Sequence, residues 1–208
     1  AAANAGRDPL DVTLVAVSKR HPDQAVRDLA ALGQRDFGEN LVQPWQARQA
    51  AFGALRWHLI GPVQSRKARD VAAGPPHLLH TVDRLKLVTA LATRLGPDAS
   101  LDVLIQVNVD REPQKAGCAP EALDALADAV AATQCLRLRG LMAIPRRPET
   151  GDPRAAFATL RELLGGLRDR LTGPAILSMG MSGDYEAAIA EGSTCVRIGT
   201  ALFGPRLS

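Results

Sequence analysis

Apolar and polar positions along this chain alternate in blocks that predict strands and helices in turn. The first apolar block covers residues 12–17, and a run that is apolar on both faces is typical of a buried strand in a parallel sheet. The block ends at Ser18 and Lys19, and Pro22 then opens a helical pattern, because proline is well tolerated in a first helical turn. Lys19 is therefore expected where a buried strand runs out into a loop.

Seven further apolar blocks predict strands, each separated from the next by a helical or polar segment. The expected strands cover residues 35–40, 55–61, 78–82, 101–109, 136–144, 175–179 and 195–198. The expected helices cover residues 41–51, 64–73, 84–95, 120–132, 153–171 and 185–191. Eight alternations with short connections predict a parallel sheet and favour a closed (β/α)8 TIM barrel over an open one. We expect residues 1–208 to form this α/β barrel as a single domain.

The two ends of the chain fit this count least well. Ten residues follow Ile198, so we expect the eighth helix to be short or to be replaced by the N-terminal segment. The first residues, AAANAGRDP, read as the end of a helix, and we expect a preceding helix to be missing there.

Composition describes an ordinary globular protein. Of the 208 residues, 46% are hydrophobic and 23% are charged, and the net charge of +3 comes from arginines scattered among acids. Aromatic residues make up 3%, which argues against a nucleic-acid surface with stacking platforms. Neither a membrane-length apolar run nor a signal peptide is recognisable, so we expect a cytoplasmic protein without a membrane partner. Cys118, Cys135 and Cys195 lack metal-ligand spacing and are expected to be reduced.

Lys19 is the candidate for covalent chemistry. The chain has three other lysines, Lys67, Lys86 and Lys115, and each lies in a helical or polar setting. Desolvation at the end of a buried strand disfavours the charged form of an amine, and a Schiff-base lysine needs a neutral, nucleophilic amine. The alternative is a lysine that extends to solvent, and this stretch alone favours that alternative.

Two turns of small residues look suited to a phosphate group. SMGMSGD (178–184) and RIGTALFG (197–204) follow the seventh and eighth expected strands, where barrels usually bind phosphate. Small residues let backbone N–H groups approach an anion, and hydroxyls add donors. Either turn alone is better explained as a tight turn, whereas the pair makes a phosphate site equally plausible. Expected at the same mouth of the barrel are Lys19, Asn40, His58 and Asn108.

Arg197 is a charged side chain within an otherwise apolar terminal strand. One interpretation is a structural ion pair inside the barrel. The other is a cation that keeps a bound heteroaromatic nitrogen unprotonated. A Schiff-base lysine with phosphate turns suggests pyridoxal 5′-phosphate, although a phosphosugar aldolase would share both features.

Seven segments carry a resemblance that spans nearly the whole chain. They are AVSKRHP (16–22), FGEN (37–40), WHLIGPVQSRK (57–67), HTVD (80–83), QVNVDREPQKAG (106–117), RGLMAIP (139–145) and LSMGMSGDYEAAIAEGSTCVRIGTALFG (177–204). On these segments the chain resembles the pyridoxal phosphate homeostasis protein family, whose single domain is similar to the N-terminal barrel of alanine racemase. The last segment is highly specific.

The resemblance implies a set of cofactor-binding residues. They are Lys19, Asn40, Ser182, Arg197, Gly199 and Thr200. Lys19 is implied to carry pyridoxal 5′-phosphate as a Schiff base, while Ser182, Gly199 and Thr200 hold the phosphate. Arg197 is implied to face the pyridine nitrogen and Asn40 to lie beside the ring. No role is implied for His58.

The chain departs from the family at two positions. Leu41 stands where the family often has tyrosine, and Gly183 stands where an acid is common. Neither departure removes a residue assigned to the cofactor, but Gly183 leaves the conformation of its turn open.

The function expected from the resemblance is binding and delivery of pyridoxal 5′-phosphate rather than robust catalysis. An arginine opposite the pyridine nitrogen weakens the ring as an electron sink, and racemisation needs two bases on opposite faces. In racemases the second base is a tyrosine from a second, β-rich domain of the partner subunit, and we expect no such domain here. The one tyrosine of the sequence, Tyr185, is expected to open a helix. We expect a monomer whose partners are the cofactor and apo-enzymes that need it. The alternative is a weak amino-acid racemase or related type III enzyme.

Overall fold

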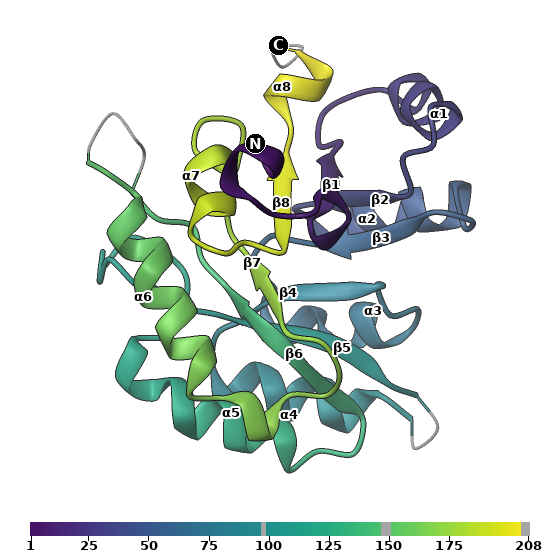
Figure 1. The fold of residues 1–208 in the computed structure, drawn as a ribbon. Helices are drawn as coiled ribbons and strands as arrows, with labels where there is room; N and C mark the ends of the chain where they lie inside the picture. The colour runs from purple at the N-terminus through teal and green to yellow at the C-terminus, as the bar shows by residue number, and fades with distance from the viewer. Residues whose placement is uncertain (97–98, 147–150, 205–208) are drawn as a thin grey trace.

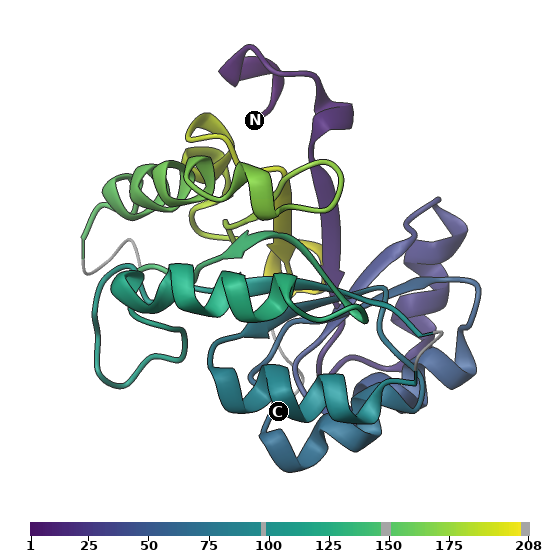
Figure 2. The ribbon, with the colours of Figure 1, turned by 90° about the horizontal axis from the view of Figure 1, so that it is seen from below.

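The computed structural model describes residues 1–96, 99–146 and 151–204. Eight parallel strands close into a barrel in chain order, with the first strand paired to the last (Figures 1 and 2). The strands are β1 (Thr13–Val17), β2 (Asp36–Glu39), β3 (Arg56–Leu59), β4 (Leu78–Val82), β5 (Leu101–Gln106), β6 (Leu136–Met142), β7 (Ile176–Ser178) and β8 (Cys195–Ile198). The predicted barrel is confirmed.

Helices cover the outside of the barrel (Figure 1). The α-helices are α1 (Asp23–Ala31), α2 (Val42–Ala51), α3 (Ala68–Ala72), α4 (Leu85–Arg94), α5 (Leu123–Ala131), α6 (Arg154–Gly165), α7 (Tyr185–Ala190) and α8 (Thr200–Phe203). Short 3-10 helices are η1 (Ala3–Ala5), η2 (Pro9–Asp11), η3 (Ser65–Lys67), η4 (Pro120–Ala122) and η6 (Arg168–Arg170). Most connections are short, and the longer ones follow β5 and β6.

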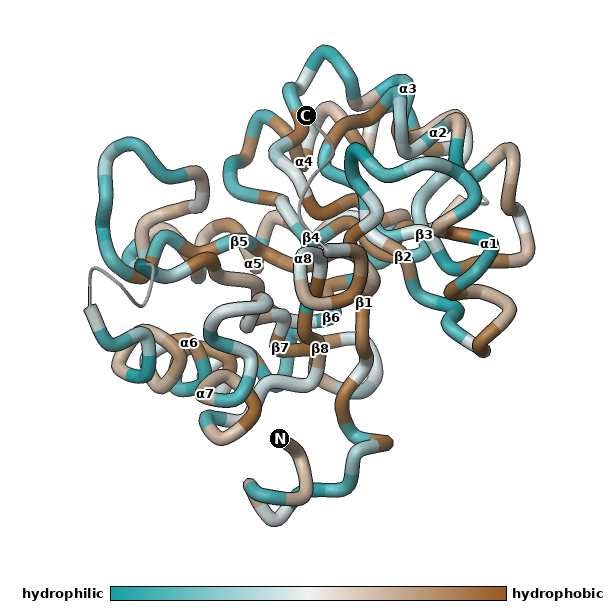
Figure 3. The backbone as a smooth tube through the Cα atoms, turned by 90° about the horizontal axis from the view of Figure 1, so that it is seen from above, coloured by the Kyte–Doolittle hydropathy of each residue, from teal (hydrophilic) through white to brown (hydrophobic). Residues whose placement is uncertain are grey.

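The main core lies between the strands and the helices. It contains Phe37 and Trp57 from β2 and β3, whose ring centroids are 5.5 Å apart, together with Leu91 from α4. Figure 3 shows the hydrophobic segments along the strands and the hydrophilic ones on the outer loops. This layer supplies most of the apolar burial that stabilises the fold.

A second, smaller apolar cluster is formed by Leu78 of β4, Leu104 of β5 and Met142 of β6, with Ile176 of β7 packed against it. Each member lies on the strand face opposite to the helix-facing core, because side chains alternate along a strand. These residues therefore fill part of the barrel interior.

Several expected element bounds differ from those observed. The predicted helix over residues 153–171 ends as α6 at Gly165, because two adjacent glycines, Gly165 and Gly166, weaken a helix interior, and η6 follows. The strand predicted over 101–109 ends at Gln106, before the loop that contains Asn108. At the N-terminus, where the end of a helix was expected, η1 is a single 3-10 turn. The eighth helix is short, as one expectation had it, since α8 has four residues.

Two further expectations concern bulk properties. Among the described residues, no helix is both long and apolar enough to cross a membrane. Cys118 and Cys195 are buried, Cys135 is half-buried, and all three are free thiols. Burial raises the pKa of Cys118 and of Cys195 to about 11, so both thiols are protonated and unreactive at neutral pH.

Candidate functional site

All six residues predicted to bind the cofactor line a single cavity of about 230 Å³ at the C-terminal end of the strands. They come from the ends of β1, β2, β7 and β8, and they are Lys19, Asn40, Ser182, Arg197, Gly199 and Thr200. Apolar side chains complete the wall: Val17, Ile60, Ile144 and Met181. An apolar cleft with a few convergent polar groups is the usual form of a small-molecule site.

Lys19 also lines a neighbouring cavity of about 290 Å³, together with Asn40 and Glu39. Glu39 is 3% exposed, and the Ser18 hydroxyl donates a hydrogen bond to its Oε1 at 2.7 Å. Burial raises the pKa of Glu39, against the opposing effects of Ser18, Arg48 and Lys19. Because Lys19 is only half-buried and interacts with this carboxyl group, desolvation is not the only influence on its amine. We assigned no role to Glu39 from sequence, although it lies within the FGEN segment.

The loop after β1 is held in a strained turn. The backbone N–H of His21 donates to the Ser18 carbonyl at 3.0 Å, and Arg20 has a φ of 65°. A non-glycine residue in this left-handed region costs about 1 kcal/mol, and such strain is concentrated at ligand sites. The His21 ring stacks on Phe203 of α8 with a centroid distance of 4.8 Å. This contact joins the Lys19 loop to the segment that contains Gly199 and Thr200.

The side chain of Asn40 has a buried oxygen, Oδ1, without a hydrogen-bond partner among the described residues. The backbone of Asn40 is packed against Gly61, where a Cβ would lie 2.0 Å from the Asn40 carbonyl oxygen, so only glycine fits. A buried acceptor without a donor is costly, and a ligand donor in the cavity would remove that cost.

The two turns predicted to hold phosphate are fastened to each other. The Ala201 N–H at the start of α8 donates to the Ser182 hydroxyl at 3.3 Å, and the Arg197 N–H donates to the Gly180 carbonyl at 2.9 Å. Gly180 has a φ of 98°, and a Cβ there would lie 2.6 Å from the Cβ of Ala188. The turn therefore requires glycine at this position. Hydroxyls and backbone amides at this edge of the barrel fit an anion such as phosphate.

Arg197 points into the barrel rather than to solvent, and it is 4% exposed. Its Nη1 donates to the Ser178 hydroxyl at 2.6 Å, and its Nη2 donates to the Ala143 carbonyl at 3.0 Å. No ion pair involves Arg197 within residues 1–96, 99–146 and 151–204, so the expected structural ion pair is not what holds it. Burial lowers the pKa of Arg197, but a guanidinium with so high a starting pKa stays charged.

Two residues expected at the mouth lie elsewhere. Asn108 ties a loop together, because its Nδ2 donates to the Glu112 carbonyl at 2.8 Å and its Oδ1 accepts from the Glu112 N–H at 3.2 Å. His58 is buried within the barrel and bonds to Asp36 and His80. Neither residue lines the cavity around Lys19. His58 does lie on a strand, as predicted, but the direction of its side chain cannot be deduced from position alone, whereas Asn108 lies in the loop after β5.

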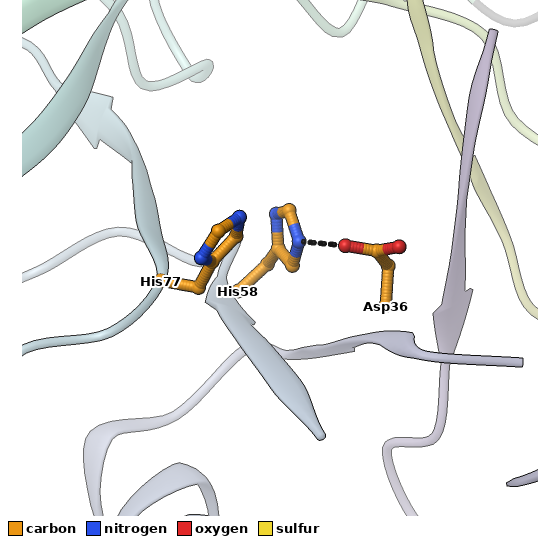
Figure 4. Close-up of side chains that lie close together, drawn as sticks. All are labelled: Asp36, His58 and His77. Atoms are coloured by element: carbon orange, nitrogen blue, oxygen red, sulfur yellow. Dashed lines mark hydrogen bonds and ion pairs between the residues drawn. The ribbon is translucent and has the colours of Figure 1, made fainter. Parts of the chain in front are cut away.

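A cluster of possible metal ligands lies at the opposite end of the barrel, at the start of β2. Figure 4 shows His77, His58 and Asp36 side by side, with ligand atoms within 4.8 Å of one another. The Asp36 carboxylate is already engaged, since Arg56 donates to Oδ1 through Nε at 2.7 Å and to Oδ2 through Nη2 at 2.5 Å. A cation would have to displace this guanidinium, so these residues do not form a convincing metal site.

Comparisons with known proteins agree on one family. The family model described as "Alanine racemase, N-terminal domain" matches residues 4–206. A protein named pyridoxal phosphate homeostasis protein from Pseudomonas aeruginosa is 53% identical over 212 residues, covering 99% of this chain and 90% of its own length. One of the same name from Escherichia coli K12 is 46% identical over 217 residues, covering 99% and 91%.

A solved structure extends the comparison to bound ligand. PipY from Synechococcus elongatus, in a structure described as having PLP bound, has a TM-score of 0.80 and 38% identity, covering 98% of this chain and 97% of that chain. Alanine racemase from Corynebacterium glutamicum has a TM-score of 0.78 at 15% identity, and the match covers 59% of that longer chain. At that identity the racemase shows a shared fold alone.

Proposed function

The chain belongs to the alanine racemase N-terminal domain family, and from that premise we propose that it binds pyridoxal 5′-phosphate as a Schiff base to Lys19 and serves in the homeostasis of this cofactor. The relatives named pyridoxal phosphate homeostasis protein support the role, and the PipY structure described with PLP supports the ligand. The observation that carries the proposal is the convergence of all six expected residues on one cavity.

Each residue would have a distinct task. The Lys19 amine would form the covalent bond to the cofactor aldehyde, and Ser182, Gly199 and Thr200 would donate hydrogen bonds to its phosphate. Arg197, buried and cationic, would face the ring nitrogen and keep a proton off it. Asn40 would accept a hydrogen bond through its unpartnered Oδ1. When bound, the cofactor supplies a ring that withdraws electrons from the carbon attached to it.

We further propose that the protein holds the cofactor without robust catalysis. Of the described residues that line the 230 Å³ cavity with all six expected residues, Lys19 is the only one with a side chain that acts readily as a base, while Glu39 lines the neighbouring cavity. Racemisation requires a second base on the opposite face of the substrate. Tyr185 lines a different cavity, beside Arg154 and Glu186. Buffering and delivery of the cofactor to apo-enzymes need only reversible attachment.

The decisive experiment is a visible absorption spectrum of the purified protein loaded with pyridoxal 5′-phosphate, before and after borohydride reduction. We expect a yellow protein whose visible band disappears on reduction as the cofactor becomes fixed to Lys19. Lys19→Ala should abolish this trapping and remain folded, whereas Lys86→Ala, which removes an exposed lysine, should behave as the unaltered protein. A colourless protein, as expected of a phosphosugar aldolase, or an adduct trapped on another lysine would refute the assignment.

Phosphate binding can be tested at Thr200. Thr200→Ala removes one donor and should weaken cofactor retention by about 1–2 kcal/mol, or roughly five- to thirty-fold in Kd. The matched control is Thr159→Ala, at an exposed position on α6 away from the cavity. Equal affinity of the two variants, measured by equilibrium dialysis, would count against the phosphate turn.

Catalysis can be tested separately by proton exchange at the α-carbon of an amino acid in deuterated water. We expect almost no exchange in the presence of the loaded protein. Steady exchange that requires Lys19 would instead establish the alternative, a weak racemase or related enzyme.

A further inference from the structure

A continuous line of hydrogen bonds crosses the interior of the barrel from Arg197 to Asp36. The Arg197 guanidinium contacts the Ser178 hydroxyl at 2.6 Å, and this hydroxyl lies 2.9 Å from His80 Nδ1. His80 Nε2 lies 2.9 Å from His58 Nδ1, and His58 Nε2 lies 3.0 Å from Asp36 Oδ1. His80 and Ser178 stand on β4 and β7, which are not neighbours in the sheet, so their contact must pass through the interior.

The donors and acceptors of this line permit one consistent direction when both histidines are neutral. Asp36 can only accept, so His58 Nε2 carries the hydrogen and His58 Nδ1 accepts. His80 then donates from Nε2 and accepts at Nδ1. The Ser178 O–H donates to that acceptor, and its oxygen accepts from Arg197, which can only donate. Every bond thus points from the guanidinium toward the carboxylate.

The surroundings keep the two ends charged and His80 neutral. Burial opposes ionisation of Asp36, but hydrogen bonds from His58 and Arg56 outweigh it and lower the pKa of Asp36 to about 2. Burial, together with the nearby His58, Arg197 and His77, lowers the pKa of His80 well below its ordinary value. His80 is therefore neutral at physiological pH, as the single direction of the hydrogen bonds in the line requires.

The line is sealed from water over most of its length. His80 and Ser178 are 0% exposed and His58 is 3% exposed. At the outer end, Arg56 has a half-exposed side chain and holds both oxygens of Asp36. A hydrogen bond in such a dry environment is stronger than one in water, and leaving one member unpaired is correspondingly costly.

We propose that Ser178, His80, His58 and Asp36 act as positioning residues for Arg197, fixing the plane of its guanidinium so that it meets the ring nitrogen of the bound cofactor. The proposal rests on the proposed function, because it assumes that the ligand ring lies against Arg197. The five N–H donors of a guanidinium share one rigid plane, so the contacts of Nη1 with Ser178 and of Nη2 with Ala143 determine its orientation. The Asp36 carboxylate at the far end polarises the line of hydrogen bonds and offsets part of the buried positive charge of Arg197.

The first test needs no cofactor. The chain has four histidines, and a nitrogen–proton correlation spectrum of their rings reports the tautomer of each. We expect His58 and His80 both to carry hydrogen on Nε2, with assignments made from single histidine variants. Hydrogen on Nδ1 of either ring would reverse a bond in the line and overturn the proposal.

The second test asks whether the line affects the cofactor site. Ser178→Ala removes the contact with Arg197 and should change the pH dependence of the visible band of the bound cofactor, with roughly tenfold weaker retention. His77→Ala is the matched control, because His77 touches the edge of the His58 ring, with centroids 5.3 Å apart, but lies outside the line. It should leave both readouts unchanged.

The outcomes separate the two proposals. A Ser178→Ala protein that is folded and spectrally identical to the unaltered protein would overturn the positioning role, while the proposed function would stand. An unaltered protein that takes up no cofactor would overturn the proposed function and with it the assignment of Arg197 to a ligand. In that case the tautomers would still decide whether the directed line exists.

Discussion

Two groups of side chains share the interior of the barrel, equally buried and opposite in chemistry. Leu78, Leu104 and Met142 form an apolar cluster, whereas His80 and Ser178 belong to a hydrogen-bonded line from Arg197 to Asp36. In the apolar cluster no contact requires a particular orientation of its partner, because dispersion and burial have no direction. In the polar line each hydrogen bond depends on the next, because the loss of one donor leaves the neighbouring group unpaired or reverses the direction of its hydrogen bond. The first group fills space, and the second specifies orientation.

The largest effect should come from the apolar group. Leu104→Ala empties a fully buried site and should lower the free energy of unfolding by about 2–5 kcal/mol, through lost burial and a residual cavity. Urea unfolding measures this loss. Leu85→Ala, at a leucine that is 53% exposed on α4, should change stability little. Equal losses at the two positions would show that Leu104 does not pack as described.

The polar group should respond non-additively. His80→Leu leaves His58 Nδ1 without its donor and the Ser178 O–H without its histidine acceptor, and it should cost about 1–3 kcal/mol. Adding Ser178→Ala should then cost much less than it does alone, giving a coupling of about 0.5–3 kcal/mol in a double-mutant cycle. Strictly additive losses in the free energy of unfolding would mean that His80 and Ser178 contribute independently and are not coupled through the line.

The pH dependence of the free energy of unfolding should show how much the ionised Asp36, at the end of the polar line, stabilises the fold. Its pKa is about 2 in the folded protein against an ordinary value of 3.8, so the ionised carboxylate stabilises the fold by about 2 kcal/mol above roughly pH 5. This contribution is lost as the pH falls from about 4 towards 2, because the carboxylate is then protonated in the folded state as well. Asp36→Asn should remove this part of the acid sensitivity, as measured by urea unfolding at several pH values. An unchanged pH profile in this variant would contradict an ionised Asp36 carboxylate in the folded protein.

The smallest effect is expected at His77. Although it lies beside His58 and Asp36, it is exposed and forms no part of the line, so His77→Ala should change the free energy of unfolding by less than about 0.5 kcal/mol. A metal site at this cluster would behave differently. Stabilisation by added zinc that disappears in His77→Ala would replace our interpretation of these residues.

Much of this architecture could be predicted from sequence, because alternating apolar blocks determine the order of strands and helices. Barrel topology brings all strand ends to one mouth and so pointed to Lys19, Asn40 and the two turns, but it pointed to His58 and Asn108 as well. The set of six cavity residues, Arg197 among them, came from the family resemblance. The contacts between side chains on strands far apart in the sequence were not predictable. His80 and Ser178 are 98 positions apart, and their contact depends on how the strands are staggered around the barrel. Glu39 was overlooked because its meeting with Ser18 joins two strands through the same stagger.

The closure of the barrel has a consequence for synthesis of the chain. β1, which leads to Lys19, pairs with β8, in which Arg197 stands opposite Val15, so the proposed binding groups lie on both sides of the seam between the first and the last strand of the barrel to be synthesised. A nascent chain cannot offer a complete pocket until its final segment has docked. Ligand capture by newly made protein would then report that the barrel has closed, and the bound molecule would stabilise the pairing of β1 with β8.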